Sequence, residues 1–188
     1  MVVFYHVCGR FTNEVNDGKG FQLTMSYVVN NEFSYEFENV KRIFIGGGKS
    51  FYVYKDDEPY LSVEVNMLDY SEHFTDSIIL GDYLLIGNYY EGVFVINLIN
   101  YEVNNIKVEG YFGYFVEGKE CVYILGCENV IAINKDNSII WKSDYIAVDG
   151  IVLNDIEDDV MSVSCEMDPP GGWVDKEIDL LTGIVIEK

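Results

Sequence analysis

Carboxylates crowd the carboxyl-terminal part of the chain, and their types and spacing are the first that suggest chemistry. The segment NDIEDDV holds four, and two more follow one predicted strand later: Asp155, Glu157, Asp158, Asp159, Glu166 and Asp168. Two opposed carboxyl groups can act as an acid and base pair, and several together can bind a hard cation such as calcium. The run lacks the D-x-D-x-D-G spacing of a calcium loop, so we expect no metal and interpret the cluster as a charged turn between strands.

Other routes to catalysis have few residues to support them. His6 lies in an apolar strand-like run, and His73 in YSEHFTDS has hydroxyl and carboxylate neighbours too close in sequence to converge as a triad. The segment GGGKS (46–50) ends like a phosphate-binding loop, but Ile43 stands where that loop needs glycine and a strand-like run follows. We interpret the three glycines as a hairpin turn or bulge. The sequence therefore predicts no cofactor and no enzymatic activity.

The segment DPPGGWVD (168–175) predicts a rigid turn and also contains a tryptophan that a turn does not need. Its two prolines cannot donate to a strand ladder, and Gly171 and Gly172 permit the positive φ that a reversal needs. Trp173 is not required by the turn. It either packs into the core or stands at the rim beside Glu166, Asp168 and Asp175, a composition typical of a protein-binding hot spot. Trp173 and Asp175 thus join the six carboxylates above as candidate partner-binding residues.

The charge balance points to the kind of partner. The chain has 32 acidic and 12 basic residues, a net charge of −20, and the stretch from Asp144 to Lys188 holds 12 acidic residues against 2 basic ones. Such a surface repels phosphate backbones and anionic leaflets, so neither nucleic acid nor a membrane is expected as a partner. A basic protein or a metal ion fits better, and solubility alone is the remaining explanation.

Cysteine usage and hydropathy indicate a cytoplasmic protein. The four cysteines, Cys8, Cys121, Cys127 and Cys165, form no C-x-x-C pair, and zinc is not expected because no histidine pair accompanies them. We interpret them as free buried thiols in a reducing compartment. No run reaches the apolar length of about 18 residues that a membrane span needs.

Short β-strands are the elements predicted to hold these residues. Runs rich in Val, Ile, Tyr and Phe between Gly, Asn and Asp are typical of strands joined by tight turns. The first ones are MVVFYHV (1–7), FQLTMSYVV (21–29), FSYEFENV (33–40), RIFIG (42–46), SFYVYK (50–55) and YLSVEV (60–65). Asp17-Gly18 is a hairpin signal between the first two runs. The segment MLDYSEHFTDS (67–77) is interpreted as a helical turn or a loop.

A period of about 40 residues relates several of these strands. RIFIG ends at Gly46, DYLLIG at Gly87 and CVYILG at Gly126, and Ser164 falls at the corresponding place in the last unit. Repeats of this length are typical of propeller blades, which must stack to bury their apolar faces. We predict one all-β domain over 1–188, with strands in 1–40 and about four strand-turn-strand repeats in 41–188. The expected architecture is a propeller-like antiparallel meander, with a β-sandwich as the alternative.

The chain from residue 110 onward resembles a group of little-characterised bacterial proteins. The shared features are the D-P-P-G-G-W turn at 168–173, an L-x-T-G turn at 180–183 and a final strand at 184–187. Proteins of this kind are similar to immunity proteins, which neutralise toxins used in competition between bacteria. The resemblance implies a binding protein with a cognate protein toxin, and the acidic charge suits a basic one. A β scaffold that binds carbohydrate or another protein, or a hydrolase with a carboxylate pair, is the alternative.

Overall fold

Strands make up nearly all of the regular secondary structure of the protein. The computed structural model of the chain describes residues 11–16, 22–31, 35–66, 74–168 and 171–186, and there the strands form four sheets, named A to D in chain order. Sheet A contains β1 (Phe11–Asn16), β2 (Gln22–Asn30), β3 (Lys41–Ile45), β4 (Gly48–Lys55) and β5 (Glu58–Asn66); sheet B contains β6 (Asp76–Leu80), β7 (Tyr83–Asn88), β8 (Gly92–Asn97) and β9 (Val103–Ile106); sheet C contains β10 (Phe112–Glu117), β11 (Cys121–Gly126), β12 (Val130–Asn134) and β13 (Ile139–Lys142); and sheet D contains β14 (Ile151–Glu157), β15 (Val160–Met167), β16 (Gly172–Asp179) and β17 (Val185–Ile186).

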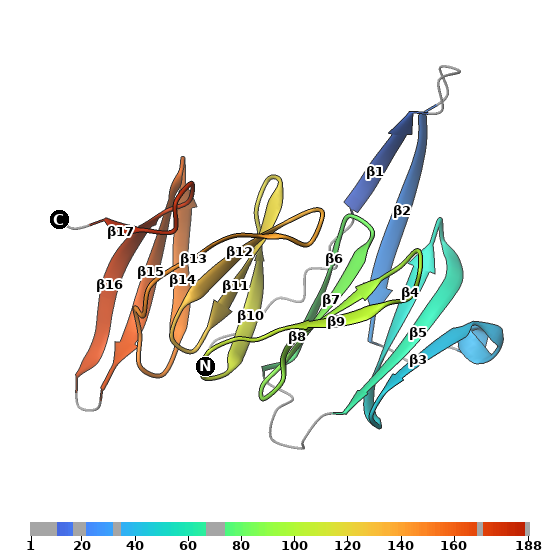
Figure 1. Cartoon of the computed structure of the whole chain (residues 1–188), viewed down its shortest axis with the longest axis horizontal. Helices are drawn as coiled ribbons and strands as arrows, with labels where there is room; N and C mark the ends of the chain where they lie inside the picture. The colour runs from blue at the N-terminus through green and yellow to red at the C-terminus, as the bar shows by residue number, and fades with distance from the viewer. Residues whose placement is uncertain (1–10, 17–21, 32–34, 67–73, 169–170, 187–188) are drawn as a thin grey trace.

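The four sheets stack face to face in a row, with sheet A at one end and sheet D at the other (Figure 1). They do not close into a ring. The all-β prediction is therefore confirmed, whereas the propeller-like arrangement is not. Sheets B, C and D are antiparallel meanders in chain order, which also differs from a sandwich of two sheets.

The apolar core consists of three layers between neighbouring sheets. Phe51, Val53 and Leu61 of sheet A pack with residues of sheet B such as Leu84 and Ile96. Equivalent layers separate B from C and C from D. Sheets B and C are thus covered on both faces and carry continuous apolar strands, whereas the two end sheets bury one face each and alternate.

Sheet A departs from the meander. Its strand order is β1-β2-β4-β5-β3, and β3 pairs parallel with β5 rather than with β4, which follows it in the chain. The turn at Gly46 and Gly47 therefore crosses the end of β5. Gly46 has φ +79°, and a Cβ there would approach the Cβ of Asn66 to 2.6 Å. Our interpretation of GGGKS as a hairpin turn or bulge is wrong, because the glycines serve a crossover. RIFIG is accordingly an edge strand and not the counterpart of β7 and β11.

Short acidic or glycine turns join several strand pairs. Asp56 and Asp57, between β4 and β5, have φ values of 51° and 67°, as a type I′ hairpin turn requires. Gly81 between β6 and β7 has φ 59°, and Asp158 between β14 and β15 has φ 52°. Part of the negative charge is thus located at turns, where short polar side chains tolerate this conformation.

Over the described residues, the strand predictions for 21–29, 42–46, 50–55 and 60–65 are confirmed as β2, β3, β4 and β5. The prediction for 33–40 is wrong, because Tyr35–Asn39 forms a 3-10 helix, η1. Phe37 of η1 packs against Tyr52 and Tyr54, with ring centroids 4.9 Å apart in each pair, so tertiary contact overrides the alternating pattern. The first run (1–7), His6, Cys8, Asp17-Gly18 and His73 lie outside the described residues.

The segment 67–77 ends inside a strand, since Asp76 and Ser77 belong to β6; residues 67–73 are outside the described part. The sequence predicts strands in 1–40 that are separate from the repeats in 41–188. In the structure β2 pairs with β4, so strands from both of these parts belong to sheet A. No helix within the described ranges is long and apolar enough to cross a lipid bilayer.

Candidate functional site

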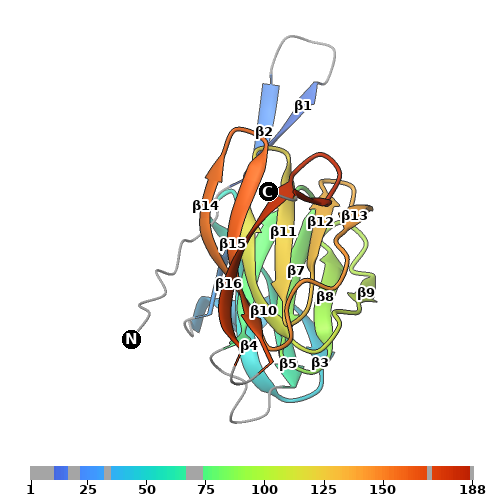
Figure 2. The same cartoon turned by 90° about the vertical axis from the view of Figure 1, so that its left-hand side faces the viewer.

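The outer face of sheet D gathers most of the predicted partner-binding residues. Met161, Val163 and Cys165 of β15 are fully buried against sheet C, so the alternate residues Ser162, Ser164 and Glu166 lie on the opposite face. Figure 2 views the molecule from this end, with β14, β15 and β16 nearest the reader. The face is therefore one side of the last sheet in the stack.

Strand register determines which carboxylates share this face. Asp155 pairs with Ser162, which pairs on its other side with Glu177. Glu157 lies one row further along, opposite Val160. Asp175 pairs with Ser164, and Trp173 pairs with Glu166. We call the set formed by Asp155, Glu157, Glu166, Trp173, Asp175 and Glu177 the acidic face.

The other three predicted residues lie in the turns at the two ends of the acidic face. Asp158 and Asp159 form the turn between β14 and β15, and both are exposed. Asp168 is exposed where β15 gives way to the turn that leads to β16. Gly172 has φ 71° and begins β16, as the predicted reversal requires. Pro169 and Pro170 lie outside the described residues.

Trp173 stands at the rim and does not enter the core. Its side chain is 53% exposed, next to Glu166 across the strand pair. Of the two alternatives left open by the sequence, the structure thus has the exposed one. An exposed tryptophan beside carboxylates offers a large apolar contact with charges around it.

Basic side chains are missing from these strands' outer surface. Lys176 is the only basic residue between Asp144 and Glu187. It pairs with Val163 on the inward side of β16, and its Nζ donates a hydrogen bond of 2.7 Å to the backbone oxygen of Ile146. The acidic face therefore has no internal cation from its own strands to neutralise it.

A short hydrogen-bond chain fixes the centre of the acidic face. Asn154 Nδ2 donates to Ser164 Oγ at 2.9 Å, and Ser164 Oγ donates to Asp175 Oδ1 at 2.6 Å. The chain crosses β14, β15 and β16, so Asp175 is held in place by its neighbours. A carboxylate oriented in this way loses less conformational entropy when it binds a partner.

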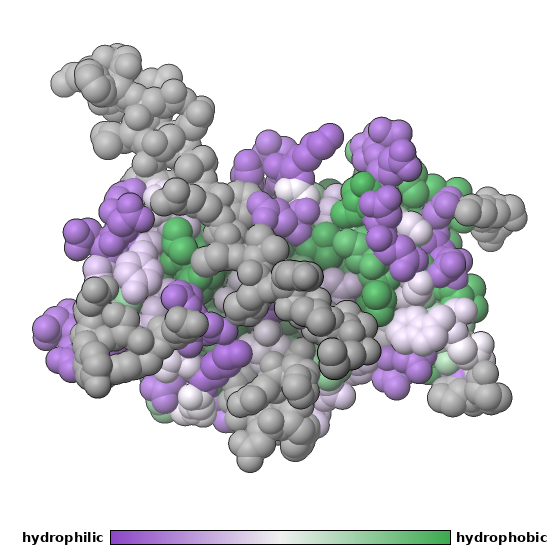
Figure 3. Space-filling model, turned by 180° about the vertical axis from the view of Figure 1, so that it is seen from behind, coloured by the Kyte–Doolittle hydropathy of each residue, from purple (hydrophilic) through white to green (hydrophobic). Residues whose placement is uncertain are grey.

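Exposed apolar side chains border the carboxylates. Val152 lies opposite Ser164 on the same face and is 41% exposed, and Ile186 of β17 pairs with Glu177. The view from behind shows hydrophobic residues toward the sheet C and D end of the molecule, with hydrophilic ones around them (Figure 3). This mixture of apolar and charged groups is typical of protein interfaces.

The described residues contain no group of three or more His, Cys, Asp or Glu side chains that could hold a metal ion. Cys121, Cys127 and Cys165 are free thiols, and burial raises the pKa of Cys127 and Cys165. A raised pKa keeps a thiol protonated and poorly nucleophilic at neutral pH. Cys127 and Cys165 therefore serve packing.

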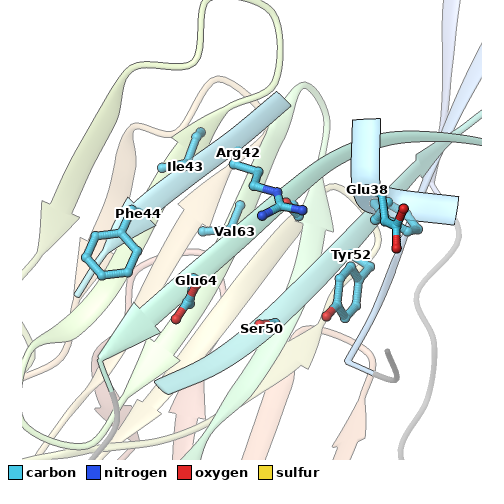
Figure 4. A pocket seen from close by; sticks show the side chains of 10 residues that line it. Glu38, Arg42, Ile43, Phe44, Ser50, Tyr52, Val63 and Glu64 are labelled. Atoms are coloured by element: carbon cyan, nitrogen blue, oxygen red, sulfur yellow. The ribbon is translucent and has the colours of Figure 1, made fainter. Parts of the chain in front are cut away.

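A groove of about 470 Å³ on the outer face of sheet A is a second candidate site that sequence reasoning missed. Glu38 of η1, Arg42 and Phe44 of β3, and Glu64 of β5 line it (Figure 4). These residues come together only because β3 crosses over to pair with β5. The only local sequence signal for this site is the alternation in β3, where Arg42 and Phe44 are exposed and Ile43 and Ile45 are half-buried.

Comparison with known proteins adds no family. No protein-family model matches the chain, and no curated protein matches it. The resemblance of the carboxyl-terminal region to immunity proteins therefore stays a prediction.

Proposed function

We propose that the protein is a non-enzymatic, cytoplasmic binding module whose acidic face binds a basic surface of another protein. The separation of charge carries this proposal. Asp155, Glu166 and Asp175 share one face of sheet D, while the single lysine of these strands turns inward. Opposite charges accelerate encounter and select partners, and Trp173 adds an apolar anchor.

A cognate bacterial toxin is the partner that the carboxyl-terminal resemblance implies. An immunity protein acts by occupying its toxin and needs no active site of its own. A basic toxin, for example a nuclease, would present the charge that complements the acidic face. The proposal is therefore that this protein neutralises such a toxin by direct binding.

The test begins with co-expression of the protein with the product of the adjacent upstream gene, followed by co-purification and a growth-protection assay. We expect a complex that forms more slowly as ionic strength rises, because steering by exposed charges is screened. The double variant Asp155→Lys/Asp175→Lys should weaken binding by about tenfold or more and abolish protection. Glu58→Lys/Glu117→Lys is the matched control, since both of these exposed glutamates lie outside sheet D.

Trp173→Ala tests the apolar anchor separately from the charges. An aromatic hot spot is worth about 2 kcal/mol or more, so affinity should fall about thirtyfold. Tyr90→Ala is the control, because Tyr90 is exposed to a similar extent, 55%, in the turn between β7 and β8. Intact binding in both the charge-reversal and Trp173 variants, with unchanged folding, would refute the proposed face.

A further inference from the structure

The groove on sheet A lies at the opposite end of the stack from the acidic face and is built on a rigid floor. Phe51, Val53 and Leu61 are buried beneath it against sheet B, with at most 1% of each exposed. The alternate residues of the same two strands, β4 and β5, point outward. η1 closes one end, because Phe37 packs on Tyr52 and Tyr54. The groove is therefore preformed by the sheet.

Hydrogen-bond donors of Arg42 and acceptors of Glu38 and Glu64 line this groove together. Arg42 extends between Glu38 at one end and Phe44 at the other (Figure 4). The ion pairs among the described residues join Lys135 to Glu120 and Lys142 to Glu109, so Arg42 forms none with Glu38 or Glu64 there. A guanidinium offers five N–H donors and a carboxylate only acceptors. A ligand that fits must supply both acceptors and donors.

Phe44 adds an exposed apolar surface to the groove. Its side chain is 70% exposed at the edge of the sheet. Gly47 borders both Phe44 and Glu64: a Cβ there would lie 3.8 Å from Phe44 Cζ and 3.5 Å from Glu64 Oε1. The missing side chain leaves the space between the ring and the carboxylate open to a ligand.

We propose that this groove binds a neutral saccharide. Sugar hydroxyls both donate to Glu38 and Glu64 and accept from Arg42, and the apolar face of a sugar ring can lie on Phe44. The two carboxylates disfavour an anionic ligand, and the positive charge of Arg42 disfavours a cationic one. The volume of about 470 Å³ lies within the range of about 300–1,000 Å³ common for small-ligand sites. The site is independent of the protein-binding face proposed above.

The test titrates the full-length ¹⁵N-labelled protein with neutral gluco-, manno-, galacto- and N-acetylhexosamine trisaccharides. We expect at least one to shift amide signals of β3, β4 and β5 and to leave those of sheet D unchanged. Phe44→Ala and Arg42→Ala should each weaken that binding by about tenfold or more. Tyr145→Ala is the matched aromatic control, since Tyr145 is 58% exposed and lies between sheets C and D in the chain.

Three results would overturn the proposal. The first is that no trisaccharide shifts any signal. The second is that the shifts persist in both groove variants, whose melting temperatures should match the parent because the two side chains are exposed. The third is that a charged probe, an oligogalacturonate or an arginine-containing tripeptide, binds the groove more tightly than every neutral sugar. None of these outcomes bears on the acidic face, because its test uses a protein partner.

Discussion

At the scale of single residues, one polar side chain ends the third strand of sheets B, C and D. Asn97 Oδ1 accepts hydrogen bonds from the backbone N–H groups of Ile99 and Asn100, at 2.8 and 3.0 Å. Asn134 Oδ1 accepts from Ser138 N at 2.9 Å, and Asp179 Oδ1 accepts from Thr182 N at 2.8 Å. Asn and Asp favour such turns because their short side chains mimic a backbone acceptor.

Asp179 makes this turn sensitive to pH, and Asp179→Asn should remove that sensitivity. Hydrogen bonds from the Thr182 hydroxyl and the Thr182 backbone N–H lower the pKa of Asp179. A lowered pKa means that its stabilisation is present above the unfolded-state value and is lost as pH falls through the folded-state value. We expect the melting temperature of the parent to drop more steeply below about pH 4 than that of Asp179→Asn.

Asp179→Ala distinguishes the stability that comes from the hydrogen bonds of the turn from the stability that comes from the negative charge. It removes the acceptor that Asn97 and Asn134 supply in their own sheets, so it should lower the melting temperature at pH 7, whereas Asp179→Asn should retain most of it. Thermal melts of the three proteins from pH 3 to pH 7 check both expectations. Parallel pH profiles for the parent and Asp179→Asn would contradict the pH sensitivity expected of Asp179. Equal melting temperatures of Asp179→Ala and Asp179→Asn at pH 7 would contradict the role of the hydrogen-bond acceptor.

At the scale of elements, the two kinds of strand could be recognised from the sequence. Leu84–Ile86 and Val130–Ile133 are continuous apolar runs, and they lie in sheets covered on both faces. VMSVSCEM in β15 alternates, and its sheet buries one face. The same alternation puts Glu166 of β15 on the acidic face, so that part of the candidate site followed from a period of two.

Local sequence patterns do not predict contacts between segments that are distant in the chain. The 3-10 helix at Tyr35–Asn39 depends on Phe37 finding two tyrosines of β4, and the sheet A groove depends on β3 pairing across a crossover. Neither partner is specified within the segment itself. A bulge in β14, where register shifts between Leu153 and Asp155, likewise decides which side Asp155 occupies.

The contact between sheets B and C gives a second prediction. Gly87 was interpreted as the end of a repeated strand, but its more specific role is to make room, since a Cβ there would overlap the ring of Phe112. Gly87→Ala should therefore cost about 1–3 kcal/mol in the free energy of unfolding. Urea denaturation measures this cost.

Two variants test the cause of that cost. Gly47→Ala should change stability by less than about 0.5 kcal/mol, because a Cβ there meets only ordinary van der Waals neighbours. Gly87→Ala/Phe112→Leu should be less destabilised than the sum of its single variants, because the smaller side chain relieves the overlap. Strict additivity would show that the ring is not the obstacle.

At the scale of the whole molecule, the repeat is visible as hydrogen bonds between neighbouring sheets. Phe115 N donates to Asp76 Oδ2 and Leu153 N donates to Tyr114 Oη, in each case across 39 positions of sequence. Trp141 Nε1 donates to the backbone oxygen of Leu180, also 39 positions away. The period detected in the sequence therefore corresponds to one sheet of the stack, and each of the two end sheets has one face without a neighbouring sheet.

The uncovered end at sheet D carries much of a net charge of −20, which predicts that salt stabilises this protein. Crowded like charges oppose the compact state, and raising NaCl from about 0.01 M to about 0.15 M shortens the Debye length from about 30 Å to about 8 Å. We expect the melting temperature to rise over this range, by about 2–4 °C for each kcal/mol of relieved repulsion. Asp155→Asn/Glu157→Gln/Asp175→Asn should raise the low-salt melting temperature and flatten its dependence on salt.

Binding of a basic partner should weaken over the same range of NaCl concentration. Added salt should therefore raise the melting temperature while it lowers the affinity for the partner. A melting temperature that falls with added salt, or is equal for the parent and the neutralised variant at low salt, would show that repulsion on the acidic face is not limiting stability.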